Sequence, residues 1–225
     1  MSRNLWITVS LLCVIALAGA SLLFLSGRGD APPGQGGAAS GTPAPAPAEL
    51  LVREDSHHLT RSEGAEVTVV EFLDFECEAC RAQFPVMERV REDYEGRINL
   101  VVRYFPLPGH ANSRPAAAAV EAAAQQGAFE EMYVRMYETQ AAWGESQESQ
   151  IRVFLGFAEE LDLDMAEFTR TMAAPETAER VQADFDDGVA LGVQGTPTIY
   201  VNGRQTESMP GYEALSALID AELGE

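Results

Sequence analysis

Apolar and polar residues follow three regular patterns along the chain from Glu66 onward. Glu66–Phe72 (EVTVVEF) is rich in β-branched residues and is typical of a buried strand. Ala79–Tyr94 repeats apolar residues at four-residue steps, which predicts an amphipathic helix with Pro85 inside it. Arg97–Tyr104 (RINLVVRY) predicts a second strand. A strand, a helix and a strand with short connections predict a βαβ unit with two parallel strands.

The pattern changes to helical spacing from Ala111 to about Leu191. Apolar side chains recur there every three or four residues, and the last helix of the stretch opens at Pro175. The sequence then predicts an antiparallel pair of strands (Pro197–Val201 and Arg204–Met209) around an Asn202-Gly203 turn, followed by a closing helix (Tyr212–Leu223). These elements predict an α/β fold into which a helical segment is inserted.

The N-terminal part of the chain follows neither pattern. Leu5–Leu25 carries no charge and is about as long as the roughly 20 residues with which a helix crosses a bilayer, so residues 1–26 are predicted to be a membrane anchor. A cleaved signal peptide with Ala18–Ala20 as its small-residue site is the alternative, although the apolar run continues beyond that site. Residues 27–49 are rich in Pro, Gly and Ala and predict an extended linker ahead of a folded domain at 50–225.

Composition indicates a packed and strongly acidic domain. Hydrophobic residues make up 46% of the chain and charged residues 22%, which are ordinary values for a globular protein. The 15 basic residues are outnumbered by 35 acidic residues, giving a formal charge of −20. Such a charge repels phosphate groups, so we expect no binding to nucleic acid.

Two of the three cysteines are neighbours at the predicted helix start. Cys77 and Cys80 are three residues apart and share one helix face, within reach of a disulfide bond. The unpaired N–H groups and the dipole at a helix N-terminus favour a thiolate on Cys77, whereas Cys80 lies one turn inside. Cys77 is therefore the expected nucleophile and Cys80 the resolving thiol. Glu76 and Glu78 oppose the thiolate. Cys13, in the apolar N-terminal run, is expected to pack as a small hydrophobic residue.

The CxxC spacing alone also fits half of a zinc site or an inert structural disulfide. A zinc site needs further ligands, and the histidines are His57 and His58, on a loop or sheet edge, and His110, with no second CxxC pair. A two-residue spacer at a helix start exposes the first sulfur, which disfavours an inert disulfide. We therefore expect neither a metal nor a cofactor, and we assign His110 to capping or packing.

Three segments carry a family resemblance. VVEFLDFECEACRAQFP looks like an active-site strand and helix, Gly195-Thr196-Pro197-Thr198 looks like a cis-proline loop, and the helical run from Ala111 to Leu191 looks like an inserted helical domain. Together, from Glu66 to Leu223, they resemble the DsbA-like disulfide oxidoreductases of the thioredoxin superfamily. The resemblance implies a thioredoxin-like fold with an inserted all-helical subdomain.

The resemblance also implies roles for three further residues. Pro197 would follow a cis peptide bond opposite the cysteines, and Thr196 would pair with an extended substrate segment. Glu71, six residues before Cys77, would be the buried acid beneath Cys80 and would relay its proton. The alternatives are an ordinary strand-start proline and a structural carboxylate.

The combined expectation is a thiol:disulfide oxidoreductase at the cell membrane, anchored by a single span, with its catalytic domain outside the cytoplasm, where disulfides persist. We expect a monomeric oxidase that acts on exported proteins through mixed disulfides and is reoxidised by a membrane redox partner. A reductase or isomerase would use the same chemistry in the other direction. A binding or chaperone module with a structural disulfide is the alternative from a different class.

Overall fold

The computed structural model describes residues 44–207 and 209–225. The predicted membrane anchor, most of the predicted linker and Cys13 lie outside these residues. Among the helices of the described residues, none is both long enough and apolar enough to cross a membrane.

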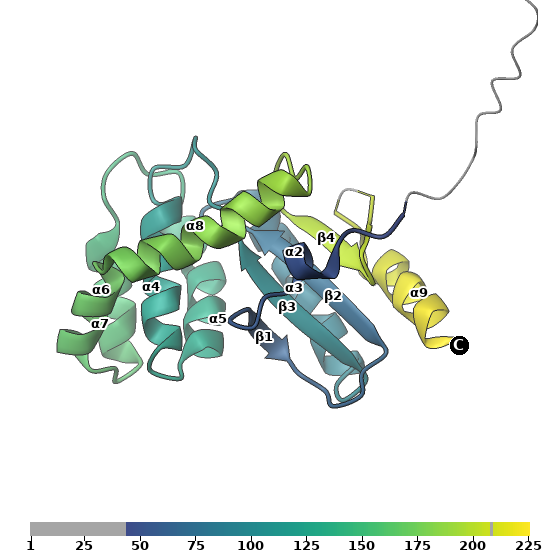
Figure 1. Ribbon diagram of the computed structural model, residues 1–225. Helices are drawn as coiled ribbons and strands as arrows, with labels where there is room; N and C mark the ends of the chain where they lie inside the picture. The colour runs from purple at the N-terminus through teal and green to yellow at the C-terminus, as the bar shows by residue number, and fades with distance from the viewer. Residues whose placement is uncertain (1–43, 208) are drawn as a thin grey trace, which may run out of the picture. The chain divides into compact units, whose positions relative to one another are not determined.

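A five-stranded mixed sheet lies at the centre of the described chain (Figure 1). Its strands are β1 (His57–Thr60), β2 (Val67–Leu73), β3 (Ile98–Tyr104), β4 (Thr198–Val201) and β5 (Arg204–Gln205). The order across the sheet is β1-β3-β2-β4-β5, with β2 parallel to β3 and the other neighbouring pairs antiparallel. The described helices are α2 (Ala48–Leu51), α3 (Glu78–Asp93), α4 (Ser113–Ala124), α5 (Phe129–Thr139), the short 3₁₀ helix η1 (Gln140–Ala142), α6 (Ile151–Glu160), α7 (Met165–Met172), α8 (Pro175–Ala190) and α9 (Tyr212–Leu223). The predicted βαβ unit is confirmed, because α3 joins the parallel strands β2 and β3.

Helices cover both faces of this sheet. Alternate residues of a strand point to opposite faces, and β2 is apolar on both. Val69 and Leu73 pack into the larger core with residues of α3 and α9, whereas Val70 and Phe72 pack into a second core with residues of α2 and α8. The strand that leads to Cys77 is therefore buried on both sides.

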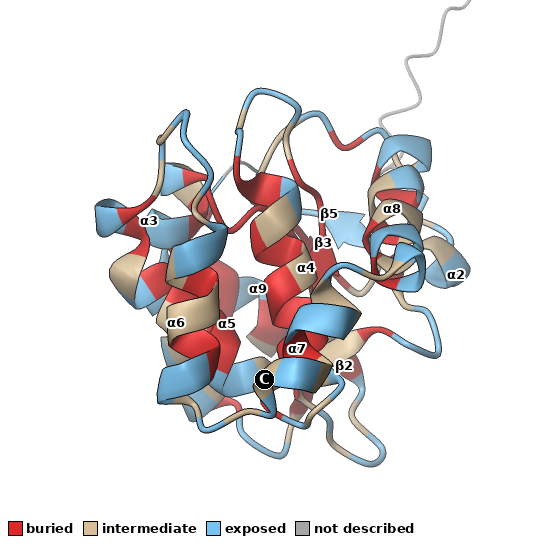
Figure 2. Cartoon of the chain, turned by 90° about the vertical axis from the view of Figure 1, so that its left-hand side faces the viewer, coloured by how far each residue is buried: buried red, intermediate tan, exposed pale blue. Residues whose placement is uncertain are grey.

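The helical insertion lies between β3 and β4. At its centre α4 packs against α5, α6, α7 and α8, and its buried positions are mostly small, including Ala116, Ala119 and Ala123. Small side chains let the surrounding helices approach α4 closely. Figure 2 shows the buried surfaces of α4 to α7 turned toward one another. The predicted α/β fold with an inserted helical segment is confirmed.

β5 is shorter than the sequence prediction, and β1 was not given bounds by it. β5 ends at Gln205, whereas the pattern predicted a strand as far as Met209. The predicted strand does not reach Met209, whose φ of +46° is a left-handed conformation that a strand does not adopt. His57 and His58 lie on β1, at the edge of the sheet.

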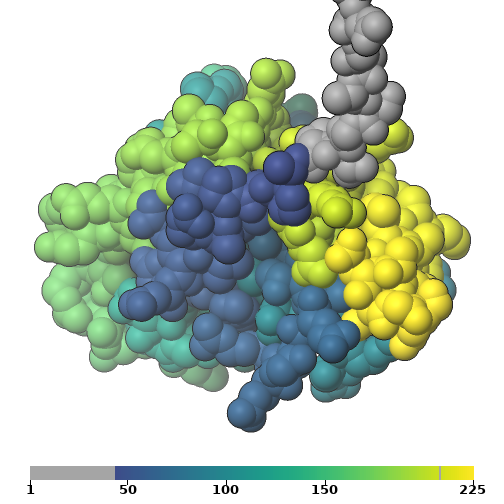
Figure 3. Space-filling view, turned by 45° about the vertical axis from the view of Figure 1, so that its right-hand side comes forward, coloured from purple at the N-terminus to yellow at the C-terminus, as the bar shows by residue number. Residues whose placement is uncertain are grey.

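Residues ahead of β1 pack against the sheet. The Ala46 N–H donates to the carbonyl of Gly203 in the β4–β5 turn at 2.7 Å, and Leu51 of α2 joins the second core. Figure 3 shows this segment, in purple, lying against the green β4–β5 region. Regular structure in the described chain thus begins at Ala48, inside the predicted linker.

A buried arginine joins three parts of this arrangement. Arg103 of β3 is fully buried and pairs with Asp184 at 2.7 Å and Asp187 at 2.6 Å, both on α8. It also donates to the carbonyls of Leu50 at 2.9 Å and Leu51 at 2.6 Å. Because a buried charge is tolerated only when it is paired and hydrogen-bonded, this cluster fixes α2 and α8 to the sheet.

Candidate active site

The CxxC pair lies at the start of α3, and both cysteines carry free thiols. Cys77 immediately precedes the first helical turn, and Cys80 lies within that turn. Cys77 is 6% exposed and Cys80 is 1% exposed. Cys77 is the more accessible of the two, as predicted, but it is less exposed than a helix-start position suggests because the chain at Thr196 packs against it.

Hydrogen bonds hold the pKa of Cys77 at about 6, well below its ordinary value. The largest contribution is a hydrogen bond from the Cys80 thiol; burial acts in the opposite direction and is outweighed. The side chain of Thr196 and the backbone N–H groups of Ala79 and Cys80 contribute further hydrogen bonds. The helix start therefore favours the thiolate as predicted, but the second cysteine contributes more.

Thr196 contacts Cys77 through its main chain and its side chain. The Cys77 thiol donates to the Thr196 carbonyl oxygen at 3.4 Å. The Thr196 hydroxyl is buried and has no hydrogen-bond partner among the described residues in this state. It is therefore available to the sulfur when the thiolate forms. The Thr196–Pro197 peptide bond is cis, as predicted.

A groove runs along the cis-proline loop and reaches Ala79, one of the two residues between the cysteines. It is lined by residues of three segments, including Ala79, Gln194, Thr196, Pro197, Thr206 and Met209. Both residues predicted to bind substrate thus lie in the wall of this groove, and Thr196 also contacts the reactive sulfur.

Burial makes the Cys80 thiol much less acidic than the Cys77 thiol. It raises the pKa of the Cys80 thiol well above its ordinary value, and the Cys80 sulfur accepts a hydrogen bond from the Asp74 N–H at 3.5 Å. Cys80 therefore remains a neutral thiol under conditions in which Cys77 is a thiolate, which suits the predicted roles of nucleophile and resolving thiol.

Glu71 lies on the sheet face that packs against α3. Its neighbours two residues away on the same face, Val69 and Leu73, belong to the core that contains both cysteines. Glu71 is 2% exposed, and burial, followed by the charges of Glu88 and Cys77, raises the pKa of its carboxyl group to about 8. The predicted buried acid is thus in place, and it is mostly protonated at neutral pH.

Asp74 organises the loop between β2 and Cys77, and sequence reasoning missed it. Its buried carboxylate accepts hydrogen bonds from the Ser113 hydroxyl at 2.6 Å, from His110 Nδ1 at 2.7 Å and from the Glu76 N–H at 2.9 Å. Burial lowers the pKa of His110, but the Asp74 hydrogen bond and the charges of Asp74, Cys77 and Glu76 outweigh this and raise it. The Cys77 charge thus favours the protonated form of His110, and the hydrogen bond to Asp74 agrees with the predicted packing role.

Gln140 holds the same loop from the helical insertion. Its side-chain amide donates to the carbonyl oxygens of Phe75 at 2.8 Å and Cys77 at 2.9 Å. Tyr137, on the preceding helix, donates to the Asp74 carbonyl at 3.4 Å. Gln140 lies 65 and 63 residues from its two partners along the chain, and no local pattern predicts such contacts.

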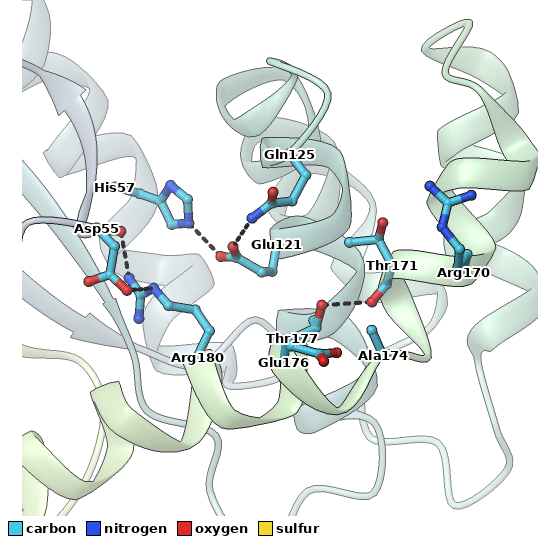
Figure 4. Close-up of a pocket in the computed structure, with 10 residues that line it drawn as sticks. All are labelled: Asp55, His57, Glu121, Gln125, Arg170, Thr171, Ala174, Glu176, Thr177 and Arg180. Atoms are coloured by element: carbon cyan, nitrogen blue, oxygen red, sulfur yellow. Dashed lines mark hydrogen bonds and ion pairs between the residues drawn. The ribbon is translucent and has the colours of Figure 1, made fainter.

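A separate cleft between β1 and the helical insertion contains none of these residues (Figure 4). Its interior groups pair with one another: His57 Nε2 with Glu121 Oε2 at 2.6 Å, Gln125 with Glu121 Oε1 at 3.0 Å, and Arg180 Nε with Asp55 Oδ2 at 2.9 Å. The His57–Glu121 pair joins β1 to the insertion, and the Arg180–Asp55 pair joins α8 to the segment just before β1. Within residues 44–207 and 209–225, no three His, Cys, Asp or Glu side chains are placed to hold a metal ion.

Known proteins share both the sequence and the fold of this domain. A family model described as Thioredoxin matches residues 54–221. Probable disulfide bond formation protein D of Bacillus anthracis is 34% identical over 164 residues, which cover 71% of this chain and 75% of that protein. The crystal structure of alpha-DsbA1 from Wolbachia pipientis superposes with a TM-score of 0.70 at 17% identity, covering 79% of this chain and 95% of the other, and shows the same fold.

A longer relative matches the same length of chain. Na(+)/H(+) antiporter NhaA 1 of Salinispora arenicola is 38% identical over 169 residues, which are 75% of this chain. The chain spans about a quarter of that antiporter, with 25% of its length covered. The family model and the disulfide bond formation relative cover most of the redox domain, and we conclude that the chain belongs to the thioredoxin superfamily and, within it, to the DsbA-like thiol:disulfide oxidoreductases.

Proposed function

We propose that this protein is an exported, membrane-tethered oxidase that introduces disulfide bonds into exported proteins through Cys77 and Cys80. The observation that carries the proposal is the pKa of Cys77, which hydrogen bonds from Cys80 and Thr196 hold at about 6 despite burial. A stabilised thiolate favours the reduced pair, and a pair that favours its reduced form gives up its disulfide to substrates.

The reaction begins when a substrate thiolate attacks Cys77 Sγ of the oxidised pair. The bond to Cys80 breaks, a mixed disulfide forms between Cys77 and the substrate, and Cys80 leaves as a thiolate that takes a proton from Glu71. A second substrate thiolate then attacks the substrate sulfur of the mixed disulfide and displaces the Cys77 thiolate. The substrate leaves with a new disulfide, and its two electrons stay on the enzyme as the reduced pair.

The substrate would lie in the groove beside the cis-proline. Thr196 and Pro197 present main chain next to Cys77, and an extended segment that pairs with it would be held in the manner of an added strand. Such recognition depends on backbone and accepts many sequences, which suits an enzyme with many exported substrates.

Reoxidation requires a second protein, because each turnover consumes the enzyme's own disulfide. We propose a membrane redox partner, with the uncharged run Leu5–Leu25 as the anchor that keeps the enzyme near it. Export is proposed because disulfides form and persist outside the reducing cytosol. The enzyme would act as a monomer and without a cofactor or metal, since electrons enter and leave through the two sulfurs.

Equilibration of the full-length protein in graded glutathione buffers tests the direction of the reaction. A reduction potential near the roughly −120 mV of DsbA supports an oxidase, whereas one near the roughly −270 mV of thioredoxin would make the enzyme a reductase. Full thiol-exchange activity in a Cys77→Ser variant would overturn the catalytic role and favour a binding module.

A further inference from the structure

The proposed reaction leaves one proton without an obvious route. Cys80 must gain a proton when its disulfide opens and lose it when the pair is reoxidised, while a bound partner covers the Cys77 side. Cys80 is 1% exposed, and Glu71, the acid that serves it, is 2% exposed. A second route to solvent is therefore needed, and this inference rests on the function proposed above.

The helix that carries the cysteines places a second acid on the relevant side. Cys80, Phe84 and Glu88 follow one another at four-residue steps on α3, so they share a helix face. Glu88 lies about 12 Å along the helix from Cys80, given a rise of about 1.5 Å per residue. Its Oε2 accepts a hydrogen bond from Arg91 at 2.8 Å, whereas its Oε1 is buried and has no hydrogen-bond partner among the described residues.

The facing helix α5 adds a second unpaired group. Tyr133 is fully buried, and its hydroxyl also lacks a hydrogen-bond partner in the described part of the chain. Its ring packs against Phe84, with ring centroids 5.6 Å apart. Arg91 pairs with both Glu88 and Glu130 and so joins α3 to α5 at the outer end of this contact. Buried polar atoms are normally hydrogen-bonded, so two such atoms beside a buried carboxyl group require an explanation.

The titratable groups around Glu71 come from these two helices. The charges of Glu88 and Cys77 raise the pKa of Glu71, and the charge of Glu71 in turn raises the pKa of Cys80, Tyr133 and Tyr137. Arg91 is the basic group that acts on the same cluster.

The pKa values of the Glu71 and Glu88 carboxyl groups are both raised. Burial, followed by the charges of Glu88 and Cys77, raises the pKa of Glu71 to about 8. Burial also raises the pKa of Glu88. Proton transfer is efficient between groups of similar acidity, and this shared direction brings Glu71 and Glu88 toward the same range.

We propose that Glu88, together with the Tyr133 hydroxyl, carries protons between Glu71 and solvent along the interface of α3 and α5. When the disulfide opens, the Cys80 thiolate takes the Glu71 proton, and the Glu71 carboxylate regains one from Glu88 through water held at the unpaired Tyr133 hydroxyl and Glu88 Oε1. Glu88 then takes a proton from the solvent. On reoxidation each transfer runs in reverse. Thiol exchange then uses the groove side of α3, and proton exchange uses the side facing α5.

Single-turnover oxidation of the full-length, reduced protein by oxidised glutathione separates the relevant steps. Attack by Cys77 depends on glutathione concentration, whereas resolution by Cys80 sets the rate plateau at high concentration. Glu88→Gln should lower the plateau about tenfold, below the 10²–10⁴-fold range typical of a primary acid or base because Glu88 acts through Glu71. The concentration-dependent phase should not change.

Three further variants make the result specific. Glu130→Gln removes the other carboxylate paired with Arg91 and should leave the plateau unchanged, whereas Glu88→Asp keeps a carboxyl group and should restore most of it. Tyr133→Phe should lower the plateau and serves as the second test if Glu88→Gln fails to fold. A plateau that is normal in Glu88→Gln and slow in Glu71→Gln would overturn the Glu88 route but keep the proposed function. If the wild-type protein showed no resolution by Cys80, the proposed function itself would fail.

Discussion

Cys77 and Cys80 are the same amino acid three positions apart, yet their surroundings give them opposite acidities. The Cys77 sulfur receives hydrogen bonds from Cys80, from Thr196 and from the helix start, whereas Cys80 is enclosed in the core and its pKa rises. The Cys80 thiol is itself the largest stabiliser of the Cys77 thiolate. Each cysteine therefore keeps the other in its role.

Thr196→Val should raise the pKa of Cys77. The variant removes one hydrogen bond to the thiolate, and about 1 kcal/mol for such a bond corresponds to about 0.7 pH unit. The ultraviolet absorbance of the thiolate, followed during a pH titration of the reduced protein, measures the change. Thr198→Val is the matched control, because the Thr198 hydroxyl donates to the Gly195 carbonyl at 2.8 Å. Equal pKa values in Thr196→Val and the wild type would rule out the side-chain contact.

Glu71→Gln should stabilise the protein in a pH-dependent way. The folded-state pKa of Glu71 is about 8, against an ordinary value of 4.5. Between pH 4.5 and about pH 8, the unfolded chain releases a proton that the folded protein retains. The wild type therefore loses about 1.4 kcal/mol of stability for each unit by which the pH rises. The advantage of the variant should therefore be absent in acid and grow until about pH 8. Urea unfolding across a pH series measures it, and a constant difference would contradict the raised pKa.

Local motifs explain which site residues the sequence could predict. The role of Cys77 follows from the CxxC spacing at a predicted helix start, whereas the roles of Glu71 and Pro197 were predicted from the resemblance of their segments to a known family. Asp74 and Gln140 act through contacts with residues far away in the chain, which exist only once the insertion has packed on the sheet. Their roles therefore became visible only in the folded structure.

At the scale of elements, the helical insertion is part of the active site. The short helix η1 donates to the two carbonyls that flank Glu76, and the end of α5 donates to a third. These hydrogen bonds fix the loop that ends at Cys77. The position of the nucleophile therefore depends on a subdomain that comes later in the chain, after β3.

Gln140→Leu should destabilise the protein by about 2 kcal/mol, because it leaves the buried Phe75 carbonyl without a partner, at about 1–3 kcal/mol. It also removes one of two hydrogen bonds to the Cys77 carbonyl, which keeps the Arg81 N–H at 3.1 Å. It should also shift the Cys77 pKa by releasing the loop. Gln126→Leu offers a comparison, since Gln126 donates to the Asp164 carbonyl at 3.2 Å on the surface, away from the cysteines. Urea unfolding together with thiolate titration checks both effects; a stability loss without a pKa change would limit Gln140 to a structural role.

The boundaries of strands that are buried on both faces were predicted best. β2 and β3 are apolar on both faces and match the predicted runs to within one residue. β5 was predicted too long: it is exposed and ends at Gln205, and the left-handed backbone at Met209 does not belong to a strand. The helix content of the insertion could be predicted from spacing, but its packing around α4 could not.

For the whole molecule, the two cores are joined through the strands they share and through one buried charge cluster. Arg103 binds Asp184 and Asp187 of α8 and the carbonyls that end α2, so the insertion, the sheet and the first described helix meet at a single guanidinium group. This cluster lies in the layer opposite α3. It therefore supports the fold without contacting the cysteines.

Asp184→Asn should lower the free energy of unfolding by about 3–5 kcal/mol, the usual cost of removing one partner from a buried ion pair. Asp184 has two arginine partners, Arg103 at 2.7 Å and Arg180 at 2.6 Å. Asp186→Asn, on the exposed side of the same helix, should change stability by less than about 0.5 kcal/mol. The reduction potential of both variants should match the wild type. A large change in potential would show that the cluster also acts on the redox pair.

The insertion holds the active-site loop by its backbone carbonyls, at Phe75 and Cys77. Backbone recognition is indifferent to side-chain identity, and the two residues between the cysteines, Glu78 and Ala79, are fully or partly exposed. Mutations at these two positions can therefore accumulate without disturbing the scaffold around them. The spacer is the part of the active site most open to evolutionary change, and a library of spacer variants would supply a graded series of enzymes on one unchanged framework.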